Sequence, residues 1–178
     1  RICRTVKGLK NARIGSIGAR TGAFQTVRYS EKILQASGVT VVTVDLSEIL
    51  GAAVAIADDA PEVLAQMDKM ASYGRIPAHI KRENIVKQAK LTLAVNRWIE
   101  KNECDASAIQ CWTSVQDNYG CATCLSMSMM SEALMPSACE VDVAGTVAMY
   151  ALQLASGKPS ALVDWNNNYG DDPDKCVF

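Results

Sequence analysis

The sequence holds a single histidine, His79, and only 6% aromatic residues. His79 precedes a long helical pattern, and a lone histidine in that position is usually structural or exposed, so we expect no metal ligation by it. Strong charge of either sign is also missing, because 18 basic residues face 19 acidic ones and leave a formal net charge of -1. No basic patch is available to follow a phosphate backbone, which argues against nucleic acid as a partner.

Long apolar runs are absent as well. No run is long enough to cross a bilayer, and the first residues do not follow the charged-then-apolar order of a signal peptide, so we expect no membrane partner. The chain has 178 residues, 49% of them hydrophobic and 21% charged, which suits one globular domain with a core and part of another. It begins at Arg1 without Met and stops at Phe178 in an expected strand, so we expect a fragment of a longer protein.

The cysteines are odd in number and scattered along the chain, which does not indicate a disulfide framework. We expect free thiols, several of them acting as small buried hydrophobes, in a reducing cytoplasm. Cys121 and Cys124 form a C-x-x-C pair. A zinc or redox role would need a second pair or a thioredoxin-like setting, and neither is found, so plain packing is favoured. The seven cysteines are Cys3, Cys104, Cys111, Cys121, Cys124, Cys139 and Cys176.

The order of patterns predicts an α/β fold, with a three-layer αβα, doubly wound, mostly parallel sheet of Rossmann-like type. β-branched and apolar runs predict the strands, and helical periodicity between capping and breaking residues predicts the helices. The expected strands are 12–18, 39–44, 107–112 and 160–163. The expected helices are 24–37, 46–57, 61–73, 81–102, 121–135 and 143–156. Residues 1–10 are expected as a basic connector, and 113–120 and 165–174 as polar loops.

The most informative stretch runs from residue 139 to residue 164, as a strand end, a helix and a second strand. Asp142 suits the N-cap of the helix, Gly157 its C-terminal end, and Pro159 prevents its continuation. A strand–helix–strand crossover usually joins parallel strands whose carboxyl ends meet at one edge of the sheet. Glu140 and Asp164 follow those two ends.

The spacing of adjacent strands, about 4.8 Å, allows two such carboxylates to reach one cation. This edge is also where open α/β sheets bind ligands. Spacing alone leaves a second interpretation open, in which Glu140 and Asp164 are solvated carboxylates at strand ends.

Residues 139–157, with Glu140, Asp142 and Gly145, and residues 162–166, with Asp164, together resemble the metal-site segment of the L-fucose isomerase and L-arabinose isomerase-like family. Residues 109–113 also resemble a family stretch that places a glutamine, here Gln110, against the sugar. The resemblance covers most of the chain, and its specific part is 110–168.

The resemblance implies a metal-dependent aldose–ketose isomerase that works through an ene-diol, with Mn²⁺ or another divalent cation as cofactor. Glu140 and Asp164 would be both the metal ligands and the catalytic residues. Gln110 would bind the sugar, and Trp112, at the same strand end, would pack on a sugar face. Trp112 filling the core remains the alternative.

The resemblance also implies a domain division and an assembly. Residues 1–156 would form an α/β domain, and 157–178 the first strand and loop of a truncated C-terminal domain. The third metal ligand, a histidine, would lie beyond Phe178. The full-length protein would be a homo-oligomer acting on a small sugar, and this fragment alone would have little activity.

Two other functions stay open. One is a non-catalytic sugar-binding α/β domain. The other is a nucleotide-binding oxidoreductase domain, in which Gly15, Gly18 and Gly22 would approach a dinucleotide and Asp45 would bind its ribose. The glycine spacing does not match the dinucleotide fingerprint, so a tight turn with an exposed Arg20 is favoured.

Overall fold

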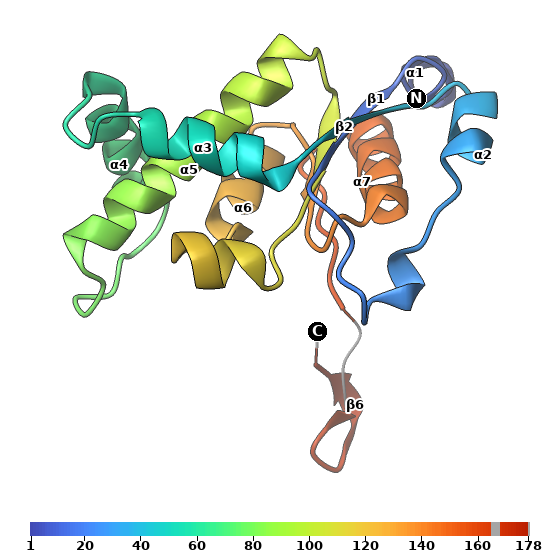
Figure 1. The fold of residues 1–178 in the computed structure, drawn as a ribbon. Helices are drawn as coiled ribbons and strands as arrows, with labels where there is room; N and C mark the ends of the chain where they lie inside the picture. Colours follow the sequence, from blue (N-terminus) through green and yellow to red (C-terminus); the bar gives the residue numbers. More distant parts are fainter. Residues whose placement is uncertain (165–167, 178) are drawn as a thin grey trace.

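The sheet is parallel and α/β in type, as predicted, with helices on both of its faces. The computed structural model describes residues 1–164 and 168–177 (Figure 1). Four strands lie in the order β2-β1-β3-β4, and every neighbouring pair is parallel. The chain runs from β1 to β2 at one edge of the sheet. It then crosses to β3 on the other side of β1 and continues to β4 at the opposite edge, which makes the sheet doubly wound. The strands are β1 (Arg13–Ile17), β2 (Thr40–Val44), β3 (Ala106–Ile109) and β4 (Ser137–Ala138).

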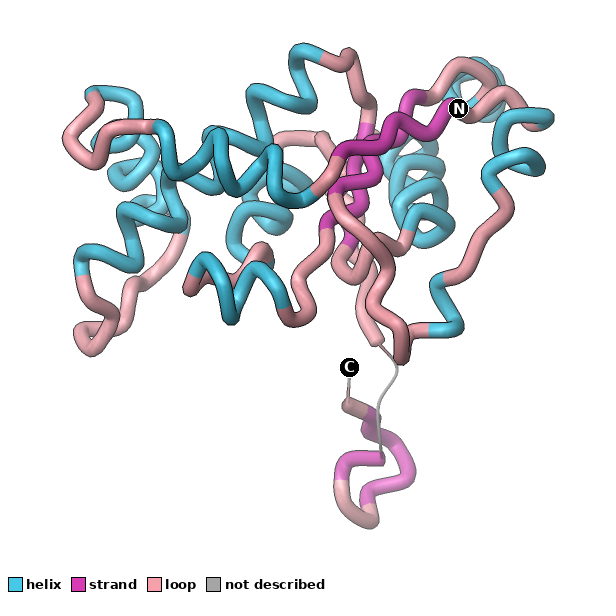
Figure 2. The backbone as a smooth tube through the Cα atoms, in the orientation of Figure 1, coloured by secondary structure: helices cyan, strands magenta, loops and turns pink. Residues whose placement is uncertain are grey.

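Helices cover the sheet from two sides, and Figure 2 shows them on either side of the strands. One apolar cluster packs Ile17 and Ile109 against helices α3 and α5, and a second packs Ile14 and Ala108 against α7. All four residues of β3 are buried, as expected for a strand covered on both faces. The helices are α1 (Ile2–Leu9), α2 (Glu31–Ala36), α3 (Leu46–Ala55), α4 (Pro61–Tyr73), α5 (Arg82–Lys101), α6 (Cys124–Glu132) and α7 (Val143–Ser156).

Several sequence predictions are wrong in detail. Most of the predicted connector 1–10 forms α1, because Gly8 lets this helix pack closely on Leu154 of α7. The predicted helix 24–37 divides into the 3-10 turn η1 (Gln25–Val27) and α2. The predicted loop 113–120 contains the π-helical turn η2 (Val115–Tyr119), which the fully buried Val115 anchors in the core.

The predicted strand 160–163 is also wrong. The segment makes no ladder with β4, and the Ser160 hydroxyl instead donates to the Met149 carbonyl at 2.9 Å, which holds it on α7. Of the predicted loop 165–174, residues 165–167 lie outside the described residues. The remainder enters a two-stranded antiparallel ribbon of β5 (Asn168–Tyr169) and β6 (Asp172–Cys176). Among the helices that the structure describes, none is long and apolar enough to cross a membrane.

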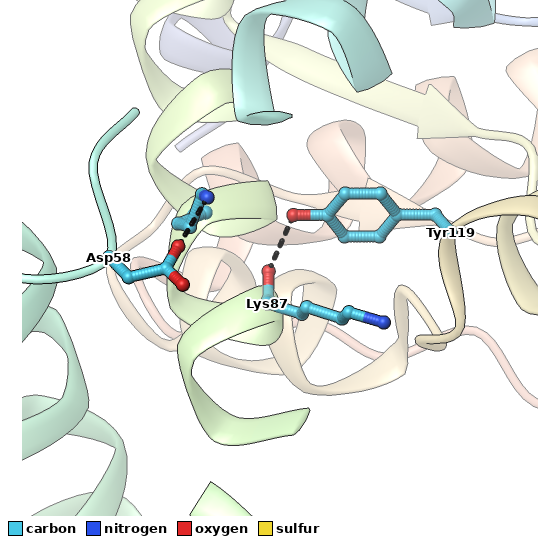
Figure 3. A network of polar contacts seen from close by, with 4 residues as sticks. Asp58, Lys87 and Tyr119 are labelled. Carbon is cyan, nitrogen blue, oxygen red and sulfur yellow. Dashed lines mark hydrogen bonds and ion pairs between the residues drawn. The ribbon is translucent and has the colours of Figure 1, made fainter. Parts of the chain in front are cut away.

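A polar network joins α5 to η2 and to the loop before α4 (Figure 3). The Tyr119 hydroxyl donates to the Lys87 carbonyl at 3.0 Å, and Lys90 pairs with Asp58 at 2.6 Å. Burial, followed by the negative charges of Cys121 and Asp58, raises the pKa of Tyr119 to about 12. These groups join neighbouring elements, and none of them lines the cavity that contains Glu140 and Asp164.

Candidate active site

A cavity of about 610 Å³ opens at the carboxyl end of β4. Its walls come from η1, α6, the turn after β4, the start of α7 and the segment 159–164. Four carboxylates line it, from Glu132, Glu140, Asp142 and Asp164. The sequence predicted that Glu140 and Asp164 meet at one edge of the sheet, and the structure brings both to this cavity.

Glu140 sits on an unusual turn. Its φ is +62°, and the φ of Val141 is +57°, so two consecutive non-glycine residues adopt the left-handed conformation. Such a conformation costs of the order of 1–3 kcal/mol for each residue and is least suited to a β-branched side chain. The core holds the turn in place, because Val141 is 3% exposed and its amide donates to the Ile109 carbonyl at 3.3 Å. Backbone strain of this kind clusters at functional sites.

The electrostatics of Glu140 agree with this placement. Burial raises the pKa of its carboxyl, and the negative charges of Asp164 and Asp142 raise it further. Asp164 is therefore close enough for its charge to oppose ionisation of Glu140. The two residues converge although Asp164 follows an extended segment on α7 and not the predicted strand.

Asp142 and Gly145 shape the start of α7. The Asp142 carboxylate accepts from the Gly145 amide at 2.7 Å, which confirms the predicted N-cap. A Cβ on Gly145 would lie 2.7 Å from Leu162, so only glycine lets the segment before Asp164 approach the helix this closely. Gly157 ends α7 in the left-handed conformation, as predicted.

The donor set at this cavity suits a hard divalent cation only in part. Carboxylate oxygens are the ligands that Mn²⁺ and Mg²⁺ favour, and Glu140 and Asp164 supply them. Within residues 1–164 and 168–177, no three His, Cys, Asp or Glu side chains are grouped to hold a metal. His79 is exposed and is not part of the cavity wall. The two carboxylates thus supply part of the ligand set that such a cation needs.

Gln110 and Trp112 do not line this cavity. The Gln110 side chain accepts from the Ala19 amide at 2.9 Å and donates to the Trp112 carbonyl at 3.3 Å, so both ends of its amide bind backbone. The Trp112 ring is 48% exposed and lies 5.3 Å from the Phe24 ring, so it does not fill the core. Their predicted contact with a sugar stays a prediction.

Two of the three glycines that would approach a dinucleotide, Gly15 and Gly18, have packing roles. A Cβ on Gly15 would lie 2.8 Å from Trp98, and one on Gly18 would collide with Gln110. Asp45 caps α3 by accepting from the Ser47 amide at 2.7 Å. Arg20 donates to backbone carbonyls of its own loop.

Sequence reasoning missed the hydroxyl groups of the cavity. Ser128 and Ser131 lie one helical turn apart on α6, and Ser137 and Ser160 line other parts of the wall. The spacing of Ser128 and Ser131 was a usable signal, because residues three apart share a helix face.

Comparison with known proteins gives relatives of one kind. No family model matches the chain. The chain is 30% identical over 168 residues to the sulfoquinovose isomerase of Alkalicoccus urumqiensis, which covers 92% of this chain and 37% of that protein. It is 28% identical over 165 residues to the sulfoquinovose isomerase of Priestia megaterium, with 92% of this chain and 36% of that protein covered.

The chain thus spans 36% to 37% of the length of these curated relatives. The relatives are sugar isomerases, as the resemblance implied, but they are named for sulfoquinovose and not for L-fucose or L-arabinose. The similarity that this chain shows is therefore to part of a sugar isomerase.

Proposed function

We propose that this chain is part of an aldose–ketose isomerase that acts on sulfoquinovose or a closely related sugar. The single observation that carries the proposal is that Glu140 and Asp164 line one cavity at the carboxyl end of β4. The relatives named sulfoquinovose isomerase support the reaction class and supply the candidate substrate.

Isomerisation of an aldose moves hydrogen between C1 and C2 of the open-chain sugar. A carboxylate takes the proton from C2, the sugar passes through an ene-diol, and the proton returns at C1. Glu140 suits this work because burial and the nearby Asp164 and Asp142 charges raise its pKa toward the range of an efficient acid–base group. Which of Glu140 and Asp164 transfers the carbon-bound proton is left open.

The proposal includes a divalent cation, Mn²⁺ or a similar ion, held by Glu140 and Asp164 together with ligands from outside this chain. When bound, such an ion polarises the sugar oxygens and so acidifies the neighbouring C–H and O–H groups. The cavity serines would orient sugar hydroxyls, with Ser128 already bonded to the Tyr73 hydroxyl at 2.7 Å. We further propose a homo-oligomer in a reducing cytoplasm, where the seven free thiols persist.

An isomerase assay of the full-length protein tests this function. Sulfoquinovose, L-fucose and L-arabinose are compared as substrates, after chelation and again after addition of Mn²⁺. We expect turnover of sulfoquinovose that chelation lowers and Mn²⁺ restores. Sugar binding without turnover and without metal dependence would contradict the proposal and favour a non-catalytic sugar-binding domain.

A further inference from the structure

Two cysteines are in contact directly beside the turn that carries Glu140. The Cys139 and Cys111 sulfur atoms lie 2.8 Å apart. Cys139 follows β4 and Cys111 follows β3, which are neighbours in the sheet. We propose that Cys111 and Cys139 form a reversible disulfide when the protein meets hydrogen peroxide, and that this bond locks the turn carrying Glu140.

The geometry requires little movement. A disulfide has a sulfur–sulfur distance of about 2.0 Å, so the two atoms need to approach by less than about 1 Å. The neighbouring strands already fix the two backbones side by side, through the parallel pairing of Ala108 with Ala138. The bond would close a loop between residues that the sheet holds together in any case.

Access to oxidant differs between the two thiols. Cys139 is half-buried and lines the cavity, whereas Cys111 is 4% exposed and does not. Peroxide that enters the cavity therefore reaches the pair from the Cys139 side. Cys124 also lines the cavity, so it is the alternative partner for a disulfide with Cys139.

The chemistry balances with hydrogen peroxide as the only oxidant. Peroxide transfers one oxygen to one sulfur of the pair, giving a sulfenic acid and one water. The other sulfur then attacks the oxidised one, the S–S bond forms, the S–O bond breaks, and the departing hydroxide takes the remaining thiol proton to become a second water. The two thiols lose two electrons and two protons in total, and a dithiol such as dithiothreitol reverses the change.

The bond would act on the turn through its closest backbone contacts. Cys139 directly precedes Glu140, and its carbonyl accepts from the Asp142 amide at 3.0 Å. Drawing Cys139 toward the end of β3 would shift the left-handed pair Glu140 and Val141. If Glu140 works as proposed above, a shift of this size lowers turnover, because catalysis is sensitive to displacements of about 1 Å.

Peptide mapping of the full-length protein is the primary test. The protein is treated with hydrogen peroxide, its remaining thiols are alkylated, and the digest is analysed by mass spectrometry. We expect a peptide pair linked through Cys111 and Cys139 that dithiothreitol removes, that Cys111→Ser abolishes, and that Cys104→Ser and Cys124→Ser leave in place. No linked pair, a Cys124–Cys139 pair, or Cys139 recovered as sulfinic acid would overturn the inference. The wild-type map decides the point even if Cys111→Ser does not fold.

The melting temperature and the turnover rate measure how the disulfide affects the turn that carries Glu140. Oxidation should raise the melting temperature by about 5 °C in the wild type and leave Cys111→Ser unchanged. It should lower turnover about tenfold in the wild type only, with recovery after reduction. A linked pair with no change in melting overturns the lock. Absence of turnover before oxidation would count against the proposed function alone, and the peptide map and melting shift would still decide this inference.

Discussion

The ends of β3 and β4 lie next to each other on the same edge of the sheet and use their polar residues in opposite ways. After β3, the Gln110 amide binds the Ala19 amide and the Trp112 carbonyl, so it holds the loops together. After β4, Glu140 faces the cavity with a raised pKa. Neighbouring positions at a ligand-binding edge are thus not equivalent, and the side chain that lines the cavity is the better candidate for chemistry.

The sheet order explains where the cavity lies. The direction of chain progression reverses between β1 and β3, and doubly wound sheets usually bind ligands in the crevice at this reversal. Here Gln110 occupies that crevice, because Gly18 has no Cβ to exclude it. The cavity is displaced by one strand, to the far side of β3 at the end of β4.

Removing the charge at the end of β4 is the strongest test of this contrast. In the full-length protein, Glu140→Gln should lower kcat at least about 100-fold, because the amide can neither accept a proton nor supply a charged ligand to the proposed cation. Melting temperature should change little, since Gln keeps the size of Glu and the buried Val141, with its amide bonded to the Ile109 carbonyl, holds the turn. Steady-state assays at saturating sugar give the measurement.

Glu132→Gln is the matched control, because Glu132 lines the same cavity from α6. Its kcat should stay within about twofold of wild type if the chemistry belongs to the β4 end. Equal losses in both variants, or activity retained in Glu140→Gln, would contradict the special role of Glu140.

Filling the crevice at the end of β3 should cost stability. Gly18 has a φ of +86°, and an added Cβ would lie 2.7 Å from the Gln110 Cβ. Gly18→Ala should therefore lower the free energy of unfolding by about 2–3 kcal/mol, from left-handed strain and displacement of Gln110. Urea unfolding with an unchanged m-value measures it.

Gly22→Ala is the control in the same loop, since no atom lies within 4 Å of its added Cβ. It should change the free energy of unfolding by less than about 1 kcal/mol. Tolerance of Gly18→Ala would mean that Gln110 moves easily, and would restore it as a candidate for binding sugar.

Much of the fold could be predicted because local signals and packing agree. The β-branched run of β2, the amphipathic pattern of α5 and the Asp142 cap each specify one element, and the core requires that same element. The convergence of Glu140 and Asp164 was also within reach, because it depends on the order of elements more than on their details.

The rest depends on long-range contacts that no local pattern records. Residues 160–163 have the composition of a strand, but α7 offers the Met149 carbonyl to Ser160, and no ladder forms. The left-handed Glu140 and Val141 contradict residue propensity, and buried contacts maintain them. That Gln110 is already bonded to backbone follows from the β1 loop, 91 residues away in sequence.

The opposite end of β3 shows that a perturbed pKa alone does not mark a functional site. Burial raises the pKa of Cys104 to about 11, with a lowering effect from Arg13 and a raising effect from Asp105. The folded protein therefore retains a proton that the unfolded chain loses above about pH 9, so stability falls between about pH 9 and 11.

Over that interval the loss attributable to Cys104 should be about 2 kcal/mol in the free energy of unfolding. Urea unfolding of the wild type and Cys104→Ala at several pH values measures it as a difference in slope. Tyr119 and Tyr150 contribute to both proteins and cancel in that difference. Parallel slopes would mean that the Cys104 thiol ionises as easily in the folded state as in the unfolded one.

The smallest expected effect concerns the contact between β3 and the start of α7. Thr146 is fully buried in α7, and its hydroxyl lies 3.1 Å from the Ser107 carbonyl of β3 and 2.8 Å from the Asp142 carbonyl. Thr146→Val keeps the branched shape and removes this donor, so the free energy of unfolding should fall by about 1 kcal/mol. Urea unfolding measures this loss.

Thr92→Val in α5 is the matched control, since Thr92 is 2% exposed and bonds the Gln88 carbonyl at 2.8 Å. Both variants should lose similar stability, but only Thr146→Val should also lower kcat by a few-fold, because Thr146 joins β3 to the helix that begins beside Glu140. Equal effects on kcat would mean that the two threonines act through stability alone. A loss of kcat confined to Thr146→Val would show that the contact between α7 and β3 helps to position Glu140.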